Sequence, residues 1–429
     1  MKNSGIEWIG NIPNSWELHS LKGHLTEIKE SNDPIKTTQV LSLTNKLGVV
    51  PYEEKGEQGN KAKENYDEYK LAYPNTIVAN SMNILIGSVG ICNYFGCVSP
   101  VYYVFKPKNE DELKFLDFIF QSQPFQKELR RYAKGILEIR LRVSANDILK
   151  RPVALPPVEQ QKKIVAFLEK KLSQVDELMA NQQEQIDKLK EYKQSVITEA
   201  VTKGLDKNAP MKDSGVEWIG EIPQEWRVFP LKALFSFGKG LPITKENLVE
   251  EGVAVISYGQ IHAKWNSGVT THKELYRRVS EMYLNTNSES LVKKGDLIMA
   301  DTSEDKEGCG NCAYIDTQDT VFAGYHTITL KSLTNFNTKY LAYLFLTDNW
   351  RSQLRKSVSG VKLFSVSKRI LGTTTVLIPK DVEKIINYLD DKCEKIDRLI
   401  AIKQEKIEKL QEYKKSLIYE YVTGKKEVA

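Results

Sequence analysis

Residues 156–205 read PPVEQQKKIVAFLEKKLSQVDELMANQQEQIDKLKEYKQSVITEAVTKGL, and this stretch decides the fold. The paired prolines favour a helix start, because proline presets φ and has no N–H to donate. Lys203 and Gly204 predict the stop, a cation in the last turn followed by a residue suited to a left-handed conformation. No glycine or proline interrupts the region between them. The pattern therefore predicts one helix of about 45 residues, roughly 60 Å long.

Apolar or long side chains recur along this helix at alternating steps of four and three, the heptad spacing of a coiled-coil seam. A helix this long needs a partner to bury such a stripe. The same chain supplies one, since residues 379–425 read PKDVEKIINYLDDKCEKIDRLIAIKQEKIEKLQEYKKSLIYEYVTGK and repeat the spacing. The predicted seam comprises Leu168, Leu172, Val175, Met179, Gln182, Ile186, Leu189, Lys193 and Val196 of the first helix, and Leu389, Cys393, Ile396, Ile400, Lys403, Ile407, Leu410, Lys414 and Leu417 of the second.

Two polar interruptions of the seam coincide in the two helices. Gln182 corresponds to Lys403, and Lys193 corresponds to Lys414. Two unrelated solvent-exposed helices would not share both register and interruptions, so we interpret the pair as an antiparallel coiled coil within the chain. If a pseudo-twofold axis relates the halves, Gln182 and Lys403 face each other near it. Such a polar seam pair can set the register at some cost in stability.

The chain is an internal duplication. Its N-terminus, MKNSGIEWIGNIPNSW, returns at Met211 as MKDSGVEWIGEIPQEW. Each half is therefore a tryptophan motif, a globular region and a long helix. The globular regions also share a helix, FLDFIFQSQPFQKELRRYAKG at 115–135 and YLAYLFLTDNWRSQLRKSVSG at 340–360, but otherwise agree only in their order of elements.

Runs of β-branched and aromatic residues predict strands, and apolar residues at helical spacing predict a helix in each globular region. The expected strands are 38–44, 76–79 and 97–105, then 254–258, 296–300 and 325–330, with helices at 113–132 and 340–357. The predicted fold class is α+β, with two mixed α/β globular domains joined by two long helices. The predicted domains are 1–155, 156–206, 207–378 and 379–429.

Composition limits the class of protein. The chain has 429 residues, 27% of them charged and 41% hydrophobic, as in an ordinary globular protein of two or more domains. A net charge of +5 permits nucleic acid as a partner without requiring it. No apolar run is long enough to span a bilayer and no signal-peptide core is present, so we expect a cytoplasmic protein without a membrane partner.

Motifs for catalysis are missing from the sequence. No phosphate-binding GxxxxGK[ST] loop is present, and Phe237-Gly238-Lys239-Gly240 is a weak match to a methyltransferase glycine loop that is better read as flexible. Cys309-Gly310-Asn311-Cys312 has the spacing of half a zinc site, but plain thiols are the preferred interpretation and no metal site is predicted.

Basic residues cluster at matching places in both halves and predict contacts to phosphates, with ordinary solvated surface as the alternative. Polar loops beside the expected strands are candidates to read bases, and turn formation is their alternative. The candidate DNA-binding residues are Thr44, Asn45, Lys46, Asn80, Ser81, Asn83, Arg130, Arg131, Lys134 and Arg140 in the first half, and Gln260, His262, Lys264, Thr302, Ser303, Arg351, Arg355, Lys356 and Lys362 in the second.

Taken together, the sequence resembles the specificity subunits of Type I restriction–modification enzymes over nearly its whole length. The resemblance rests on MKDSGVEWIGEIPQEW, on LPPVEQQKKIVAFL before the first long helix, on VITEAVTKGLDKNAPMKDSG between the halves, and on the repeated order. It implies two target recognition domains, each reading one part of a split, asymmetric sequence in double-stranded DNA. It also implies that the coiled coil sets the distance between those parts.

The resemblance implies partners as well. Two methyltransferase subunits would bind the chain and carry S-adenosylmethionine, and restriction subunits that use ATP and Mg²⁺ would join through them. The chain itself would hold no cofactor and no catalytic residue. Apolar residues of the tryptophan motifs are candidates for partner binding, with packing on their own domain as the alternative: Trp8, Ile9, Trp218 and Ile219.

Other interpretations remain open at this point. One is a specificity subunit of another bipartite system, in which a single partner both cuts and methylates. A self-contained nuclease and a purely structural coiled-coil adaptor are further alternatives. The second half also departs from the family pattern, because LIPKDVEKI replaces the double proline and Glu-Gln before its long helix.

Overall fold

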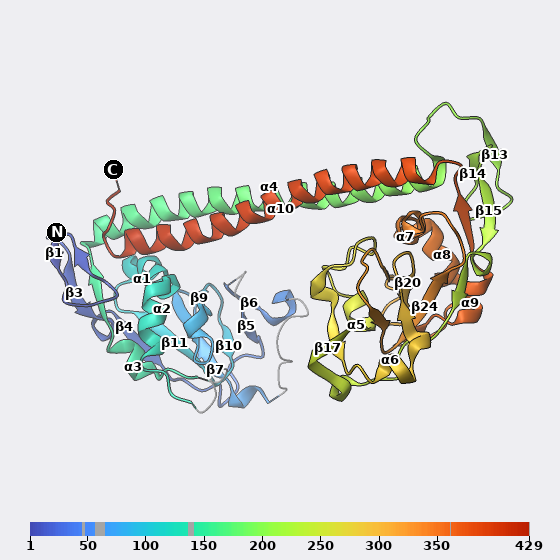
Figure 1. Ribbon diagram of the computed structural model, residues 1–429. Helices are drawn as coiled ribbons and strands as arrows, with labels where there is room; N and C mark the ends of the chain where they lie inside the picture. Colours follow the sequence, from blue (N-terminus) through green and yellow to red (C-terminus); the bar gives the residue numbers. More distant parts are fainter. Residues whose placement is uncertain (45–47, 56–64, 136–140, 361, 429) are drawn as a thin grey trace. The chain divides into compact units, whose positions relative to one another are not determined.

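The computed structural model describes residues 1–44, 48–55, 65–135, 141–360 and 362–428 (Figure 1). The chain divides into two compact units. Unit 1 comprises Met1–Gln183 with Gln404–Ala429, and unit 2 comprises Glu184–Lys403. The boundary crosses both long helices, so each unit contains part of both. Among the described residues, no helix is long and apolar enough to cross a membrane.

Unit 1 is built on a four-stranded antiparallel sheet in the order β4-β11-β8-β9. Its strands are β4 Leu25–Ile28, β11 Tyr102–Pro107, β8 Thr76–Asn80 and β9 Val89–Cys92. Two-stranded ladders surround it: β1 Lys2–Asn3 with β2 Asn11–Ile12, β3 Glu17–Ser20 with β12 Pro152–Leu155, β5 Leu41–Thr44 with β6 Gly48–Pro51, and β7 Lys70–Ala72 with β10 Gly96–Val98. The helices are α1 Leu113–Gln121, α2 Gln123–Arg130, α3 Ala145–Leu149 and the first part of α4 Val158–Lys203.

Unit 2 has the corresponding sheet in the order β16-β24-β20-β22, with strands Phe235–Phe237, Thr327–Ser332, Leu297–Ala300 and Cys312–Tyr314. A second sheet, β18-β17-β23-β19, consists of Arg277–Val279, Leu248–Ile256, Val321–Ala323 and Leu291–Val292. The smaller ladders are β13 Met211–Asp213 with β14 Glu221–Pro223, β15 Arg227–Pro230 with β26 Thr375–Ile378, and β21 Thr302–Ser303 with β25 Phe364–Ser365. The helices are α5 Tyr258–Ile261, α6 Tyr283–Thr286, α7 Lys339–Phe345, α8 Asp348–Ser357, α9 Lys368–Thr373 and part of α10 Val382–Val422.

The sequence predicted a single helix in each globular region, and the structure has two helices in its place. In unit 1 the break falls at Ser122, whose extended backbone (ψ 129°) precedes α2, and Pro124 sits in the first turn of α2. Proline at that position cannot continue an upstream helix. In unit 2 the break falls at Thr347, whose hydroxyl accepts a hydrogen bond from Trp350 N at 3.3 Å. A local start signal therefore overrides the continuous helical periodicity.

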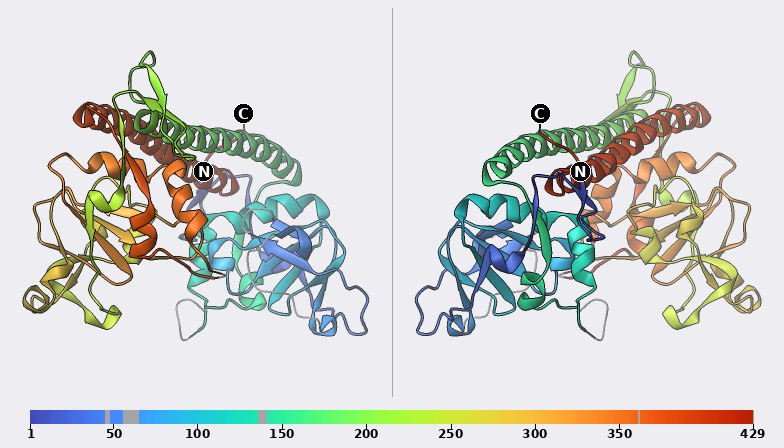
Figure 2. Two further views of the ribbon diagram at one scale, coloured as in Figure 1. Left: turned by 90° about the vertical axis from the view of Figure 1, so that its right-hand side faces the viewer. Right: turned by 90° about the vertical axis from the view of Figure 1, so that its left-hand side faces the viewer.

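The long helices pack against each other within each unit and against its globular part (Figures 1 and 2). In unit 1, Lys414 Nζ lies 2.7 Å from Asp176 Oδ1, and the Phe167 and Tyr421 rings are 4.6 Å apart. In unit 2, Lys193 Nζ lies 2.7 Å from Asp397 Oδ2. In unit 1, moving forward along α4 from Phe167 to Asp176 means moving backward along α10, so the local packing is antiparallel.

The predicted seam positions are turned inward. Leu168, Leu172, Val175, Ile186 and Ile396 are buried, and the polar seam residue Gln182 is 8% exposed. Lys403 donates a hydrogen bond to the side-chain oxygen of Gln185. The expected partner of Lys403 was Gln182, and the observed one lies one turn further along α4.

Each long helix ends at a glycine that lies against a tryptophan motif. Gly424 has φ +67°, and a Cβ there would lie 2.4 Å from Cδ of Pro13 and 3.3 Å from the Trp16 ring. Gly204 has φ +81° and would bring a Cβ to 3.2 Å from the Trp226 ring. Glycine is required at both ends because of the left-handed backbone and the close ring.

Unit 1 buries a carboxyl group where the repeat has none. Asp117 on α1 is 8% exposed, its Oδ2 accepts from Gln121 Nε2 at 2.5 Å, and its Oδ1 has no hydrogen-bond partner among the described residues. The repeat places Ala342 at the equivalent position. Burial raises the pKa of Asp117 from 3.8 to about 7.

The stability of unit 1 should therefore depend on pH through Asp117. A carboxyl whose folded pKa is raised supports folding fully below pH 3.8, and its contribution is lost as pH rises through about 7. Between these limits we expect a loss of about 2–4 kcal/mol in the free energy of unfolding. Asp117→Asn, neutral throughout, should abolish that slope in urea titrations at pH 4.5 and 8. An unchanged slope would show that Asp117 ionises freely in the folded unit.

Candidate nucleic-acid interface

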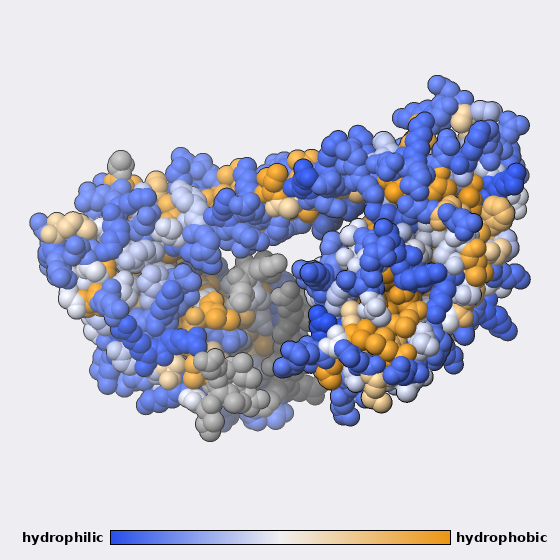
Figure 3. All heavy atoms as spheres, in the orientation of Figure 1, coloured by the Kyte–Doolittle hydropathy of each residue, from blue (hydrophilic) through white to orange (hydrophobic). Residues whose placement is uncertain are grey.

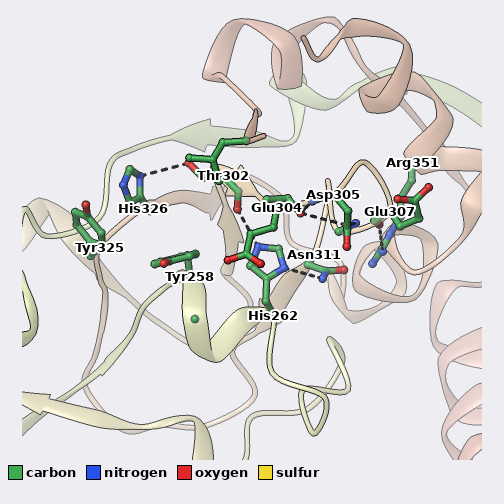
Figure 4. A pocket seen from close by; sticks show the side chains of 14 residues that line it. Tyr258, His262, Thr302, Glu304, Asp305, Glu307, Asn311, Tyr325, His326 and Arg351 are labelled. Atoms are coloured by element: carbon green, nitrogen blue, oxygen red, sulfur yellow. Dashed lines mark hydrogen bonds between the residues drawn. The ribbon is translucent and has the colours of Figure 1, made fainter. Parts of the chain in front are cut away.

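Three segments of unit 2 converge on one cavity of about 680 Å³ (Figure 4). They are α5, the loop after β20, and the turn between β23 and β24, and Arg351 of α8 and Leu363 complete the lining. His262, Thr302 and Ser303, which the sequence predicted as DNA-binding, all line this cavity. The ring atom Nε2 of His262 lies 2.9 Å from the carbonyl oxygen of Thr302. Two polar loops about 40 residues apart in the sequence thus form one site.

Aromatic rings and imidazoles line one side of this cavity. The Tyr258 and Tyr325 ring centroids are 6.1 Å apart, and the His326 ring lies 4.0 Å from Tyr325. His326 has φ +53°, a left-handed conformation unusual for a residue other than glycine. Its Nδ1 lies 3.0 Å from Asp301 Oδ1, and Asp301 N donates to its carbonyl at 3.1 Å. Backbone strain held by such contacts is typical of functional sites.

Two residues predicted to bind DNA, Gln260 on α5 and Lys264 just after it, have side chains with different roles. The side-chain oxygen of Gln260 accepts a hydrogen bond from Ser257 N at 3.1 Å as part of the helix cap, and the role of Gln260 in reading bases stays a prediction. Lys264 is exposed, as a phosphate contact requires. Its neighbour Trp265, which the sequence analysis missed, is 58% exposed.

The arginines of α8 hold the loop that forms the cavity wall. Arg351 Nε donates to the Phe345 carbonyl at 2.7 Å, and its Nη1 donates to the Glu307 carbonyl at 3.3 Å. Arg355 donates to the carbonyls of Lys306 and Glu307 at 3.2 and 3.3 Å. Burial lowers the pKa of Arg351. These side chains therefore support the loop, and their role as phosphate contacts stays a prediction.

Two predicted phosphate contacts, Arg131 in unit 1 and Lys356 in unit 2, form equivalent ion pairs. Arg131 Nη2 lies 2.6 Å from Glu7 Oε2, and Lys356 Nζ lies 3.1 Å from Glu217 Oε2. Each pair ties the end of a globular helix to a tryptophan motif. Both are solvent-exposed, so each contributes little to the free energy of unfolding. Lys362 is exposed as well.

The loops predicted to read bases in unit 1 are mostly structural. Asn80 and Ser81 are buried, and Asn80 Oδ1 accepts from Met82 N at 3.1 Å in a local turn. Turn formation, the alternative interpretation, explains them, while Asn83 is exposed. Thr44 ends β5 and donates to the Gly48 carbonyl at 3.3 Å.

The remaining basic candidates of unit 1 lie at the end of α2 and beyond. Arg130 and Lys134 are exposed, and the backbone N–H of Lys134 donates to the Arg142 carbonyl at 2.8 Å. The predicted sites Asn45, Lys46 and Arg140 lie outside the described residues.

The tryptophan motifs do not present the apolar stripe that was predicted for partner binding. Ile9 is fully buried and Trp8 is 9% exposed, packed on Phe125 with ring centroids 5.3 Å apart. Trp218 and Ile219 are half-buried against the core of unit 2. These residues pack on their own unit, where burying apolar area against the core is favourable, and partner binding through them stays a prediction. Along the long helices, in contrast to the tryptophan motifs, hydrophobic residues are visible at the surface (Figure 3).

The Cys309–Cys312 segment is a turn anchored in the core. Both thiols are 1% exposed and unpaired. Burial raises the pKa of Cys309 and raises that of Cys312 to about 12, which opposes the thiolate form that zinc requires. Among the described residues, no cluster of three or more histidine, cysteine or acidic side chains could hold a metal.

Comparisons with known proteins agree with the duplicated architecture. The model of the Type I restriction modification DNA specificity domain matches residues 13–188 and again 223–412. A type I restriction enzyme specificity subunit of Methanocaldococcus jannaschii, MjaVIII, is 25% identical over 357 residues, 81% of this chain and 77% of that protein.

Solved structures resemble the chain in fold. One belongs to a study of complex assembly and conformational transition in a type I restriction–modification system, with a TM-score of 0.70 at 14% identity, covering 96% of this chain and 98% of that one. The HsdS subunit from Thermoanaerobacter tengcongensis has a TM-score of 0.51 at 14% identity, covering 99% and 100%.

The chain belongs to the family of Type I restriction modification DNA specificity domains and carries that domain twice. Its relatives are specificity subunits of type I enzymes, so the alternative of a system whose partner both cuts and methylates is not favoured.

The support given by Arg351 can be separated from phosphate binding. Arg351→Met should lower the free energy of unfolding of unit 2 by about 1–3 kcal/mol, because the Phe345 and Glu307 carbonyls lose their donor. Lys356→Ala, which removes only an exposed ion pair, is the control and should cost under about 1 kcal/mol in calorimetric unfolding. The salt dependence of DNA binding should not change in Arg351→Met. A slope reduced by about one would instead identify Arg351 as a phosphate contact.

Proposed function

We propose that the chain is the DNA-reading subunit of a type I restriction–modification complex, in which the globular part of each unit reads one half of a split, asymmetric target. The observation that carries this proposal is the double match of the DNA specificity domain, once in each half of the chain. The globular parts differ from one another in sequence and in sheet content, and so two different half-sites are expected.

We further propose that α4 and α10 form one antiparallel coiled coil whose halves are related by a pseudo-twofold axis. The ion pairs support it, because a shift of 221 positions converts Asp176 into Asp397 and Lys193 into Lys414. The same shift exchanges the two bridges, Lys193–Asp397 and Lys414–Asp176. A rigid helix pair of this kind would set the spacing between the two half-sites.

The chemistry is assigned to partners in this proposal. Two methyltransferase subunits would bind the chain with S-adenosylmethionine and modify adenine, and restriction subunits would add ATP- and Mg²⁺-dependent cleavage. The chain's own role would be binding. Phosphate contacts supply affinity in such complexes, and groups reaching the base edges supply sequence preference.

The function is tested by mapping adenine methylation on single DNA molecules from cells with and without this chain, the partner methyltransferase being active in both. A split motif that disappears with the chain is the expected result. Replacing residues 17–150 by the corresponding region of another family member should change one half-site and leave the other intact. Unchanged methylation in cells lacking the chain would contradict the proposal.

The helix pair should set the spacer. Inserting seven residues into α4 and seven into α10 adds one heptad to each and preserves the seam. This lengthens the pair by about 10 Å, or about three base pairs of DNA. We expect a spacer longer by that amount with both half-sites unchanged. An altered half-site with the original spacer would show that the helices do not measure the distance.

A further inference from the structure

The Cys309-Gly310-Asn311-Cys312 turn places an amide at the cavity of unit 2. The flanking thiols are anchored in the core. Gly310 has φ +94°, and a Cβ there would lie 3.0 Å from the Leu354 side chain, so only glycine suits this position. Asn311 N donates to the Gly308 carbonyl at 3.0 Å, and its own carbonyl accepts from Ala300 N at 3.0 Å. The turn is held on both sides, and Asn311 lines the cavity.

A chain of hydrogen bonds fixes the orientation of the Asn311 amide (Figure 4). The Thr302 carbonyl can only accept, so His262 Nε2, at 2.9 Å, must carry the proton. In the neutral ring Nδ1 is then an acceptor, and it takes a hydrogen bond from Asn311 Nδ2 at 3.0 Å. Gly308 makes room, since a Cβ there would lie 3.2 Å from Cε1 of His262.

The same amide keeps one donor and one acceptor for a ligand. One of the two Nδ2 hydrogens is used by His262, and within the described part of the chain no hydrogen bond to Asn311 Oδ1 is found. The amide is half-buried at a cavity that also holds the rings of Tyr258 and Tyr325. An acceptor beside a donor at amide spacing matches N6–H and N7 of adenine in the major groove.

We propose that Asn311 reads the major-groove edge of an adenine in the half-site recognised by unit 2, and that His262 positions its amide. This inference rests on the proposed function, and it assigns one base of the half-site that unit 2 reads. Guanine presents O6 and N7, two acceptors. Because His262 holds Nδ2 of the amide, the Asn311 oxygen would face O6 without a proton between them. The arrangement therefore discriminates adenine from guanine through His262, which holds the Asn311 amide in one orientation.

The first experiment combines the methylation map with the replacement of residues 17–150, because the half-site that survives the replacement is the one read by unit 2. That half-site should contain an adenine at which Asn311→Ala relaxes the preference. Asn285→Ala, an exposed amide on α6 of the same unit, is the matched control and should leave the motif unchanged. A surviving half-site without adenine overturns the assignment and leaves the proposed function standing. The absence of any split motif overturns both.

The second experiment uses the full chain with its methyltransferase and duplexes carrying 7-deazaadenine, which lacks N7, or purine, which lacks the N6 amino group. For the native chain, each analogue at the assigned position should weaken binding roughly 5- to 150-fold. Asn311→Ala should bind native and analogue duplexes equally. An analogue penalty that persists in Asn311→Ala would show that another group reads the base.

His262 has its own readout. His262→Phe keeps a ring and removes the acceptor that orients the amide, so we expect guanine to be tolerated at the assigned position while the rest of the motif and the unfolding temperature of unit 2 remain near native values. His262→Gln, which can again accept at a similar place, should restore part of the preference for adenine. Equal loss at every position of both half-sites in His262→Phe would mean that His262 only supports the fold, and the positioning role would be overturned.

Discussion

The constraint on which the structure depends is the burial of a heptad stripe on two helices too long to stand alone in water. In each unit the paired segments of α4 and α10 bury apolar residues against each other and continue directly into the core of the globular part. Leu168 and Ile418 belong to the same cluster as the sheet residue Phe105, and Val196 and Leu389 belong to the same cluster as Leu297. The helices are thus one wall of each core. A rigid attachment of recognition domain to helix follows from this shared core.

Duplication shows which features the scaffold needs. The interhelical bridges, the tie from the globular helix to the tryptophan motif, and the glycine at the end of each long helix all occur twice. Differences concentrate in the globular parts of the two units. Unit 2 has a second sheet and the cavity at α5, and unit 1 has a buried carboxyl at Asp117 where its repeat has alanine. This division suits a protein whose frame is constant while each half recognises a different sequence.

The candidate site was predictable only in part. His262 was predicted in one polar loop and Thr302 and Ser303 in another, and these loops do meet at one cavity. Gln260, Asn80 and Arg351 were predicted as well, and their polar atoms serve a helix cap, a local turn and a loop support. Residue type alone does not distinguish a side chain whose polar atoms are hydrogen-bonded to the backbone from one whose polar atoms are available to a ligand. Asn311 was overlooked because the cysteines around it suggested a metal motif.

The sequence by itself determined the duplicated order, the two long helices with their inward-facing positions, and the family, because heptad spacing, prolines, glycines and repeated motifs act through short-range geometry. Only the tertiary structure decided which polar groups remain available. The Thr302 carbonyl determines which ring nitrogen of His262 carries the proton, and His262 orients the Asn311 amide. The two contacts join residues that are 40 and 49 positions apart in the sequence. Such a chain depends on distances between atoms at the end of α5 and in the segment between β20 and β22. Those distances are fixed by the packing of the sheet beneath them and have no periodic signature in the sequence.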